Sequence, residues 1–291
     1  MALIMSQDIQ RRIQIEKIKK IRQQEEEGRK RISNIKYKIA IMSGKGGVGK
    51  SFITANLGLA LATLGKKVII LDSDVHGPSI PKLLGLHGRS MSVGPNGLIP
   101  LEADLGVKVV SVDFLMPNEE SALIWRGPMK TSLIRELLAK VDWGRQDFML
   151  IDLPPGTGDE PLTVVQLIKD INGSIIVTIP SDLSRIVVKK AITFCRRLKV
   201  NIIGVIENMS GFTCPESGKT YYIMGKGAGE KICKEMDVNF LGNIPLDPRI
   251  SETIDQGKPF LTTYPNIEVS KKIVNIAEWI IKYLKAQENV N

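Results

Sequence analysis

The sequence predicts an α/β protein, built on a mostly parallel, twisted sheet of about seven or eight strands with helices on both faces. From Lys36 onward, short β-branched apolar runs alternate with longer segments of helical period, which is the pattern of repeated βα units. Most of the short runs are apolar on both faces, so helices should cover both sides of the sheet. A glycine-rich turn also links the first short run to the first helical segment.

The composition indicates one large folded domain with an appendage. The chain has 291 residues, of which 43% are hydrophobic and 24% charged, and these values exclude an extensively disordered or fibrous protein. No apolar run approaches the ~18 residues of a membrane-spanning helix, and residues 1–30 lack the continuous apolar segment of a secretory leader. Its three cysteines are too few for a disulfide framework. Together these features predict a cytoplasmic protein.

The first element is a basic segment at the N-terminus. Residues 1–36 hold ten Lys/Arg against five Asp/Glu, a net charge of +5 out of the +9 of the whole chain. Isoleucines at roughly helical spacing predict an exposed amphipathic helix that ends near Asn34. These are Ile9, Ile13, Ile15, Ile18 and Ile21. Because no aromatic residues interleave to stack on bases, we favour a solvated helix on the body or a partner subunit over specific nucleic-acid or membrane binding.

The rest of the chain, residues 37–291, is predicted to form a single domain of alternating strands and helices. Strands are expected at Lys38–Met42, Lys67–Asp72, Val107–Phe114, Phe148–Asp152, Ser174–Pro180, Asn201–Glu207 and Phe240–Ile244. Helices are expected at Ser51–Leu64, Met129–Val141, Pro161–Ile171, Ser184–Leu198, Gly227–Met236 and Ile267–Lys285. The apolar stripe of the last helix is interpreted as core packing, so no membrane partner is expected. In such a sheet, ligands bind at the carboxyl ends of the strands.

The turn after the first strand has the sequence of a phosphate-binding loop. Residues 44–51 read Gly-Lys-Gly-Gly-Val-Gly-Lys-Ser, which matches GxxxxGK[ST] between a strand and a helix. The glycines allow backbone N–H groups to form an anion nest, to which the helix N-terminus adds its positive dipole end. Lys50 places a charge on the β- and γ-phosphates, and the Ser51 hydroxyl is a ligand for Mg²⁺. The predicted ATP contacts are Gly44, Lys45, Gly46, Gly47, Val48, Gly49, Lys50, Ser51 and Phe52.

Carboxylates follow two further strands at the same edge of the sheet. Asp152 comes directly after a run of apolar strand residues, the usual position of a carboxylate that binds Mg²⁺ through water. Asp72 and Asp74 follow the second strand. A purely turn-forming role is the alternative for Asp74, since aspartate often starts a turn ahead of Gly-Pro.

Lys45 stands one residue after the first glycine, where ordinary P-loops do not require a lysine. With it, the loop resembles the deviant Walker A loop of the dimeric ATPases that include ParA, MinD, the nitrogenase iron protein and the Mrp (ApbC) group. In that class the extra lysine reaches the partner's nucleotide and stabilises developing phosphoryl charge, as an arginine finger does. The resemblance implies a catalytic set of Lys45, Lys50 and Asp74, with Asp74 positioning the attacking water beside Mg²⁺. A solvated loop lysine is the alternative for Lys45.

Four further segments narrow the resemblance from this class of ATPases to one family within it. They are Asp74–Pro81, Trp125–Met129, Asp152–Asp159 and Glu207–Phe212. Together they closely resemble the Mrp (ApbC) family of iron–sulfur cluster carriers, from about Lys38 to the last helix. The resemblance implies a homodimer with two ATP sites near the interface, in which Asn208 hydrogen-bonds adenine and Pro245 belongs to the loop that lines the base. For Asn208, a turn-forming role is the alternative.

The chain departs from this family at the cluster site. The family has Cys-Pro-x-Cys after its Gly-Phe segment, whereas this sequence reads Cys214-Pro215-Glu216-Ser217. Two complete motifs would give a dimer-bridging iron–sulfur cluster four thiolates, but two copies of this chain give only two. Cys233 and Cys195 lie in helical segments and are interpreted as core residues. Cys214 is therefore the candidate cluster ligand, on the resemblance alone.

The function predicted from these observations is that of an ATP-binding and ATP-hydrolysing carrier that assists iron–sulfur cluster assembly or transfer. Its partners would be iron–sulfur apoproteins or scaffold proteins, and its hydrolysis slow and Mg²⁺-dependent. Two alternatives stay open. One is a ParA/MinD-like positioning ATPase, and the other is a nucleotide-dependent scaffold that has lost its cluster, which the serine at position 217 favours.

Overall fold

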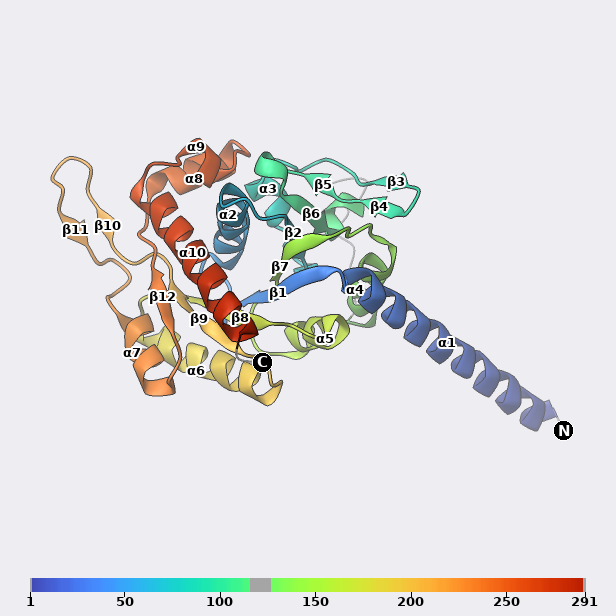
Figure 1. Cartoon of the computed structure of the whole chain (residues 1–291). Helices are drawn as coiled ribbons and strands as arrows, with labels where there is room; N and C mark the ends of the chain where they lie inside the picture. The colour runs from blue at the N-terminus through green and yellow to red at the C-terminus, as the bar shows by residue number, and fades with distance from the viewer. Residues whose placement is uncertain (1, 116–126, 290–291) are drawn as a thin grey trace.

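Eight strands form one twisted sheet in the order β12-β9-β8-β1-β7-β2-β6-β5 (Figure 1). The structure is a computed structural model that describes residues 2–115 and 127–289. All neighbouring strands in the sheet are parallel except β5, which pairs antiparallel with β6 at one edge. The strands of the sheet are β1 (Ile35–Met42), β2 (Val68–Asp72), β5 (Leu101–Glu102), β6 (Lys108–Ser111), β7 (Gln146–Asp152), β8 (Gly173–Thr178), β9 (Ile202–Glu207) and β12 (Phe240–Asn243).

Helices cover both faces of the sheet and enclose two apolar cores. One core lies under α2 (Lys50–Thr63), α3 (Ile80–Leu83), α9 (Phe260–Thr263) and α10 (Glu268–Glu288). The other lies under α4 (Gly127–Lys140), α5 (Asp159–Ile168), α6 (Asp182–Arg197) and α7 (Ala228–Met236). Successive residues of β1 alternate between the two cores, with Ile39 and Ile41 on one side and Ala40 and Met42 on the other. This two-sided burial explains why the strands are apolar throughout.

Smaller elements complete the fold. These are the short hairpins β3 (Ser92–Gly94) with β4 (Gly97–Ile99) and β10 (Phe212–Thr213) with β11 (Thr220–Tyr221), the 3₁₀ turns η1 (Asp104–Gly106) and η2 (Val112–Leu115), and α8 (Pro248–Asp255). The β10–β11 hairpin projects from the body at the left of Figure 1. Within the described ranges, no helix is both long and apolar enough to cross a membrane.

The predicted elements are present, and each predicted end lies within three residues of the observed one. One segment is corrected. The strand expected at Val107–Phe114 stops at Ser111, and the chain turns into η2. The hydroxyl of Ser111 accepts a hydrogen bond from the backbone N–H of Asp113 at 3.2 Å, which replaces a strand contact by a local turn.

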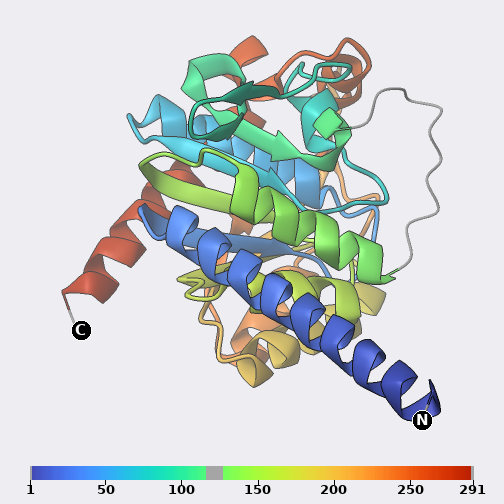
Figure 2. The same cartoon turned by 90° about the vertical axis from the view of Figure 1, so that its right-hand side faces the viewer.

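The basic N-terminal segment forms the long helix α1 (Ala2–Ile32). Figures 1 and 2 show it lying beside α4 near its C-terminal end and extending past the body toward the N-terminus. Its last turns are held by Ile32, which is buried, and by Glu25, whose Oε1 lies 3.2 Å from Arg135 Nε. Farther out, Ile15 and Ile18 are 45% and 46% exposed. The division into an extension (residues 1–36) and a main domain stays a prediction.

Candidate nucleotide and cysteine sites

The glycine-rich loop joins β1 to the first turn of α2, as the motif requires. Gly47 and Gly49 have φ values of 75° and 79°, in the left-handed region that favours glycine. Gly49 is the N-cap of α2, and its carbonyl accepts the first helical hydrogen bond, from Ile53 N at 3.0 Å. The loop therefore ends where the positive end of the helix dipole can face an anion.

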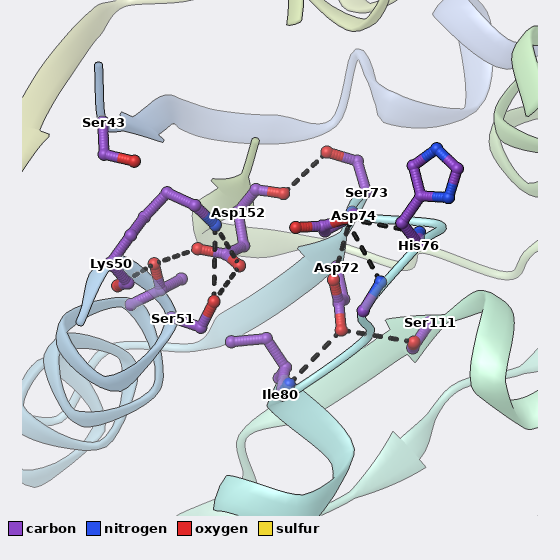
Figure 3. Close-up of polar contacts among 12 residues, drawn as sticks. Ser43, Lys50, Ser51, Asp72, Ser73, Asp74, His76, Ile80, Ser111 and Asp152 are labelled. Carbon is purple, nitrogen blue, oxygen red and sulfur yellow. Dashed lines mark hydrogen bonds and ion pairs between the residues drawn. The ribbon is translucent and has the colours of Figure 1, made fainter. Parts of the chain in front are cut away.

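Lys50 lies at the centre of a buried polar cluster at the carboxyl edge of the sheet (Figure 3). Its Nζ is 2.6 Å from Asp152 Oδ2, and both side chains are almost fully buried. The Ser51 hydroxyl donates to the same carboxylate oxygen at 2.6 Å. Thr54, one turn farther along α2, donates to Asp152 Oδ1 at 2.6 Å. The ammonium and the two hydroxyls thus hold the carboxylate at the end of β7, next to the phosphate loop.

A second buried carboxylate neighbours this cluster. Asp72, at the end of β2, pairs in register with Asp152 at the end of β7. Burial and the charge of Asp152 raise the pKa of Asp72 well above its usual value, while Lys50 opposes this effect. Asp72 accepts hydrogen bonds from the backbone N–H groups of Asp74 at 3.2 Å and Ile80 at 3.3 Å. This carboxylate therefore holds both ends of the loop that carries Asp74.

Asp74 is found in its turn-forming arrangement. Its Oδ1 accepts from the backbone N–H groups of His76 and Gly77, each at 3.3 Å. Figure 3 shows it at the same edge of the sheet as Asp152. The turn expected as the alternative for this residue is thus present, and its role in positioning water stays a prediction.

The donor set suits Mg²⁺. A hydroxyl and a carboxylate are the hard oxygen ligands that this ion prefers, and Ser51 and Asp152 already meet at one point. Lys50 shares that carboxylate oxygen and would compete for it, but its charge is free to move to a phosphate once one is bound. Ser51 would bind the ion directly, with Asp152 and Asp74 next to it.

Two other predicted loop residues are placed as follows. Lys45 is half-buried in the loop, and its carbonyl accepts from the Ser43 hydroxyl at 2.9 Å. Its role across a dimer interface stays a prediction. The Phe52 ring is buried in the core and lies edge-on to Phe260, so only its backbone N–H can serve a phosphate.

Asn208 lies directly against the phosphate loop. It follows β9, is 3% exposed, and its Nδ2 donates to the Val48 carbonyl at 3.0 Å. The loop after β12 comes close to the same region, since the Ile244 carbonyl accepts from Ser210 N at 2.9 Å and half-buried Pro245 follows. The two residues expected to contact adenine therefore come from neighbouring loops, although Asn208 is occupied with Val48 here.

Cys214 lies on the projecting β10–β11 hairpin and is half-buried. Hydrogen bonds from the Ser217 side chain, and then from the backbone N–H groups of Ser217 and Glu216, lower the pKa of its thiol. Burial instead raises the pKa of Cys195, and it raises the pKa of Cys233 to about 12. Within the described residues, no group of three or more His, Cys, Asp or Glu side chains gathers to hold a metal. Of the three thiols only that of Cys214 is not buried, and one chain's residues do not form a four-thiolate cluster site.

Several residues near the site were not predicted from sequence. Thr54 could have been found, because position i+4 after Lys50 faces the same side of α2. The cluster of Lys130, His76 and Glu160 could not have been predicted, because its residues come from three distant segments. In this cluster Lys130 Nζ lies 2.5 Å from Glu160 Oε1 and also contacts the His76 ring. Of the Trp125–Met129 segment, Trp125 and Arg126 lie outside the described residues.

This fold and site define a P-loop NTPase: a glycine loop between β1 and α2, with a buried lysine, a serine hydroxyl and a strand-end aspartate. The ParA family model described as NUBPL iron-transfer P-loop NTPase matches residues 34–281. The chain belongs to that family.

Individual relatives agree with this assignment. The chain is 49% identical over 258 residues to an iron-sulfur cluster carrier protein of Saccharolobus solfataricus, covering 89% of this chain and 87% of that protein. A solved nucleotide-binding protein of Archaeoglobus fulgidus, in complex with ADP, is 42% identical with a TM-score of 0.72, covering 81% of this chain and 92% of that chain. The cell division protein MinD of Aquifex aeolicus is 23% identical with a TM-score of 0.61, covering 84% and 97%, and shows the fold alone.

Proposed function

We propose that this protein is a homodimeric, Mg²⁺-dependent ATPase that carries iron–sulfur clusters to apoproteins. The observation that carries the nucleotide part is the buried contact of Lys50 and Ser51 with Asp152 at the phosphate loop. The cargo is proposed from the carrier proteins to which the chain is similar. The Cys214 thiol on the projecting hairpin supports that cargo, because its hydrogen bonds lower its pKa and thiolates are the usual ligands of such clusters.

A transfer assay tests the proposal. The protein would be reconstituted anaerobically with iron and sulfide, desalted, and mixed with an apoprotein whose activity requires a cluster. We expect restoration of that activity with the wild type and less than a tenth of it with Cys214→Ala. Equal transfer by the two proteins would contradict a carrier role for Cys214.

A nucleotide-dependent scaffold without a cluster is the second candidate. The specific observation that favours it is Ser217, which supplies a hydroxyl where a second thiolate would be needed. This candidate predicts nucleotide-dependent binding of apoproteins with no iron bound to the dimer. A positioning ATPase like MinD has support from the fold alone.

A further inference from the structure

The segment that carries Cys214 has both of its ends next to one buried carboxylate. The chain leaves β9 at Glu207, runs through the β10–β11 hairpin, and returns to the body at the start of α7. Glu207 is 1% exposed. Its Oε1 accepts from the Ser210 hydroxyl at 2.7 Å, and its Oε2 accepts from the Gly229 backbone N–H at 2.6 Å. Thus one oxygen holds the outgoing end of the segment and the other holds the returning end.

The outgoing end also touches the phosphate loop. Asn208, next to Glu207, donates to the Val48 carbonyl at 3.0 Å. A Cβ atom built on Gly49 would lie 2.2 Å from Asn208 Nδ2, so the loop and this side chain are packed as closely as a glycine allows. A nucleotide in the loop would therefore lie next to Asn208, one residue from Glu207 and two from Ser210.

The route from Ser210 to Cys214 is short and bonded along its length. Ser210 N donates to the Ile244 carbonyl at 2.9 Å, and the Gly211 carbonyl accepts from Leu246 N at 2.8 Å. The next residues, Phe212 and Thr213, form β10, and Cys214 follows. Displacement at Asn208 can therefore reach the thiol through a few residues with fixed backbone contacts.

We propose that Glu207 is a positioning residue that couples the nucleotide loop to the cysteine hairpin, so that nucleotide binding at the loop alters the exposure of Cys214. The coupling rests on the proposed function, in which the phosphate loop binds nucleotide and Cys214 binds the cargo, and it adds the path that connects the two sites. With a nucleotide bound, Asn208 is held in place, the root of the hairpin fluctuates less, and the half-buried thiol of Cys214 becomes exposed less often.

Alkylation of Cys214 by iodoacetamide tests this coupling without any cluster. The other two thiols, Cys195 and Cys233, are only 2% and 3% exposed, so the fast phase reports Cys214, and Cys214→Ser gives the background. We expect saturating ADP to slow wild-type alkylation at least threefold. In Ser210→Ala, which removes one bond to Glu207, the effect should fall below about 1.5-fold while the Kd for ADP stays within twofold.

Further variants distinguish coupling through Glu207 from protection of the thiol by an interface. Glu207→Gln should behave as Ser210→Ala does. Ser270→Ala, on α10, removes a serine hydrogen bond to the Tyr264 backbone carbonyl and should keep the wild-type response. An unchanged or faster wild-type rate with ADP would overturn the coupling. An equal slowing in Ser210→Ala would overturn the path, since protection by an interface would survive that substitution. If the wild type did not bind ADP at all, the result would instead contradict the proposed function.

Discussion

At the scale of single residues, Lys50 is the group on which the nucleotide site depends. Its ammonium is buried beside Asp152 and is the main positive charge available to the triphosphate. Lys50→Ala should therefore abolish ATP binding and hydrolysis, as measured by calorimetry and phosphate release. Lys67→Ala removes an exposed lysine before β2 and should leave both unchanged. Wild-type affinity in Lys50→Ala would exclude this loop as the site.

The environment of Cys214 gives a pH prediction. The Ser217 side chain is the largest cause that lowers the pKa of this thiol, so the wild-type thiolate forms at a lower pH than an ordinary cysteine. Ser217→Ala should shift the pH profile of Cys214 alkylation to higher pH, and at any pH below the pKa the rate should fall. The backbone donors at Glu216 and Ser217 remain, so the shift is partial.

A matched hydroxyl provides the control for that profile. Thr220 lies on the same hairpin and pairs with the Thr213 hydroxyl at 3.1 Å rather than with the thiol. Thr220→Ala should therefore keep the wild-type profile. If Ser217→Ala leaves the profile in place, or moves it to lower pH, the assigned cause of the shift is wrong.

How far residues could be predicted depended on whether they belong to a local pattern. The contact between Lys50, Ser51 and Asp152 follows from a motif and from the end of a strand in the same sheet. Glu207 belongs to one of the segments that carry the resemblance, but nothing in the sequence indicated that its carboxylate would bond to the start of α7. The Asp74 turn was visible in sequence only as an alternative.

At the scale of elements, α1 has two parts that should respond differently to truncation of a side chain. Ile32 is 1% exposed and packs in the core with residues of α4, whereas Ile18 is 46% exposed. Ile32→Ala should lower the free energy of unfolding by about 2–4 kcal/mol. The matched change Ile18→Ala should cost less than about 0.5 kcal/mol, as measured by urea denaturation. Equal losses would show that the outer part of α1 is also packed.

Long elements were predictable because their periodicity extends over many residues. The amphipathic helix α10 shows this clearly, whereas the buried strand β7 was predictable from its continuous apolar run. The two-residue strands β10 and β11 carry no period, and their pairing depends on side chains and a turn at Cys214. At Ser111, a side-chain hydrogen bond ended a strand whose apolar sequence continued. Local polar contacts thus explain most differences between expectation and structure.

At the scale of the whole molecule, Lys45 is predicted to act on the partner's nucleotide. Lys45→Ala should keep ATP binding and lower hydrolysis by ~10³-fold, as loss of a trans-acting finger does. Mixing Lys45→Ala subunits with Asp74→Ala subunits distinguishes action on the partner's nucleotide from action within one subunit. A heterodimer would contain one site with both groups intact, so phosphate release should recover in part. No recovery, with heterodimers demonstrated by mass spectrometry, would mean that Lys45 acts within its own subunit or not at all.

The proposed dimer would also set how much cluster the protein can hold. Two copies supply Cys214 twice, and Ser217 adds hydroxyls that are far less acidic than thiols, so two of the four usual thiolates are lacking. The reconstituted wild type should therefore hold labile iron at well below one cluster per dimer, measured by absorbance and iron content. Cys214→Ala should remove what is bound.

Restoring the second thiolate should reverse this weakness. Ser217→Cys places a thiol on the hairpin beside Cys214 and should raise occupancy toward one cluster per dimer, because two subunits then supply four thiolates. Ser92→Cys, at an exposed serine in β3, adds a thiol elsewhere and should not raise it. A stable, fully occupied cluster in Cys214→Ala would show that the ligands lie outside this hairpin. The alkylation response of Cys214 to nucleotide would then concern the hairpin alone and not the cargo.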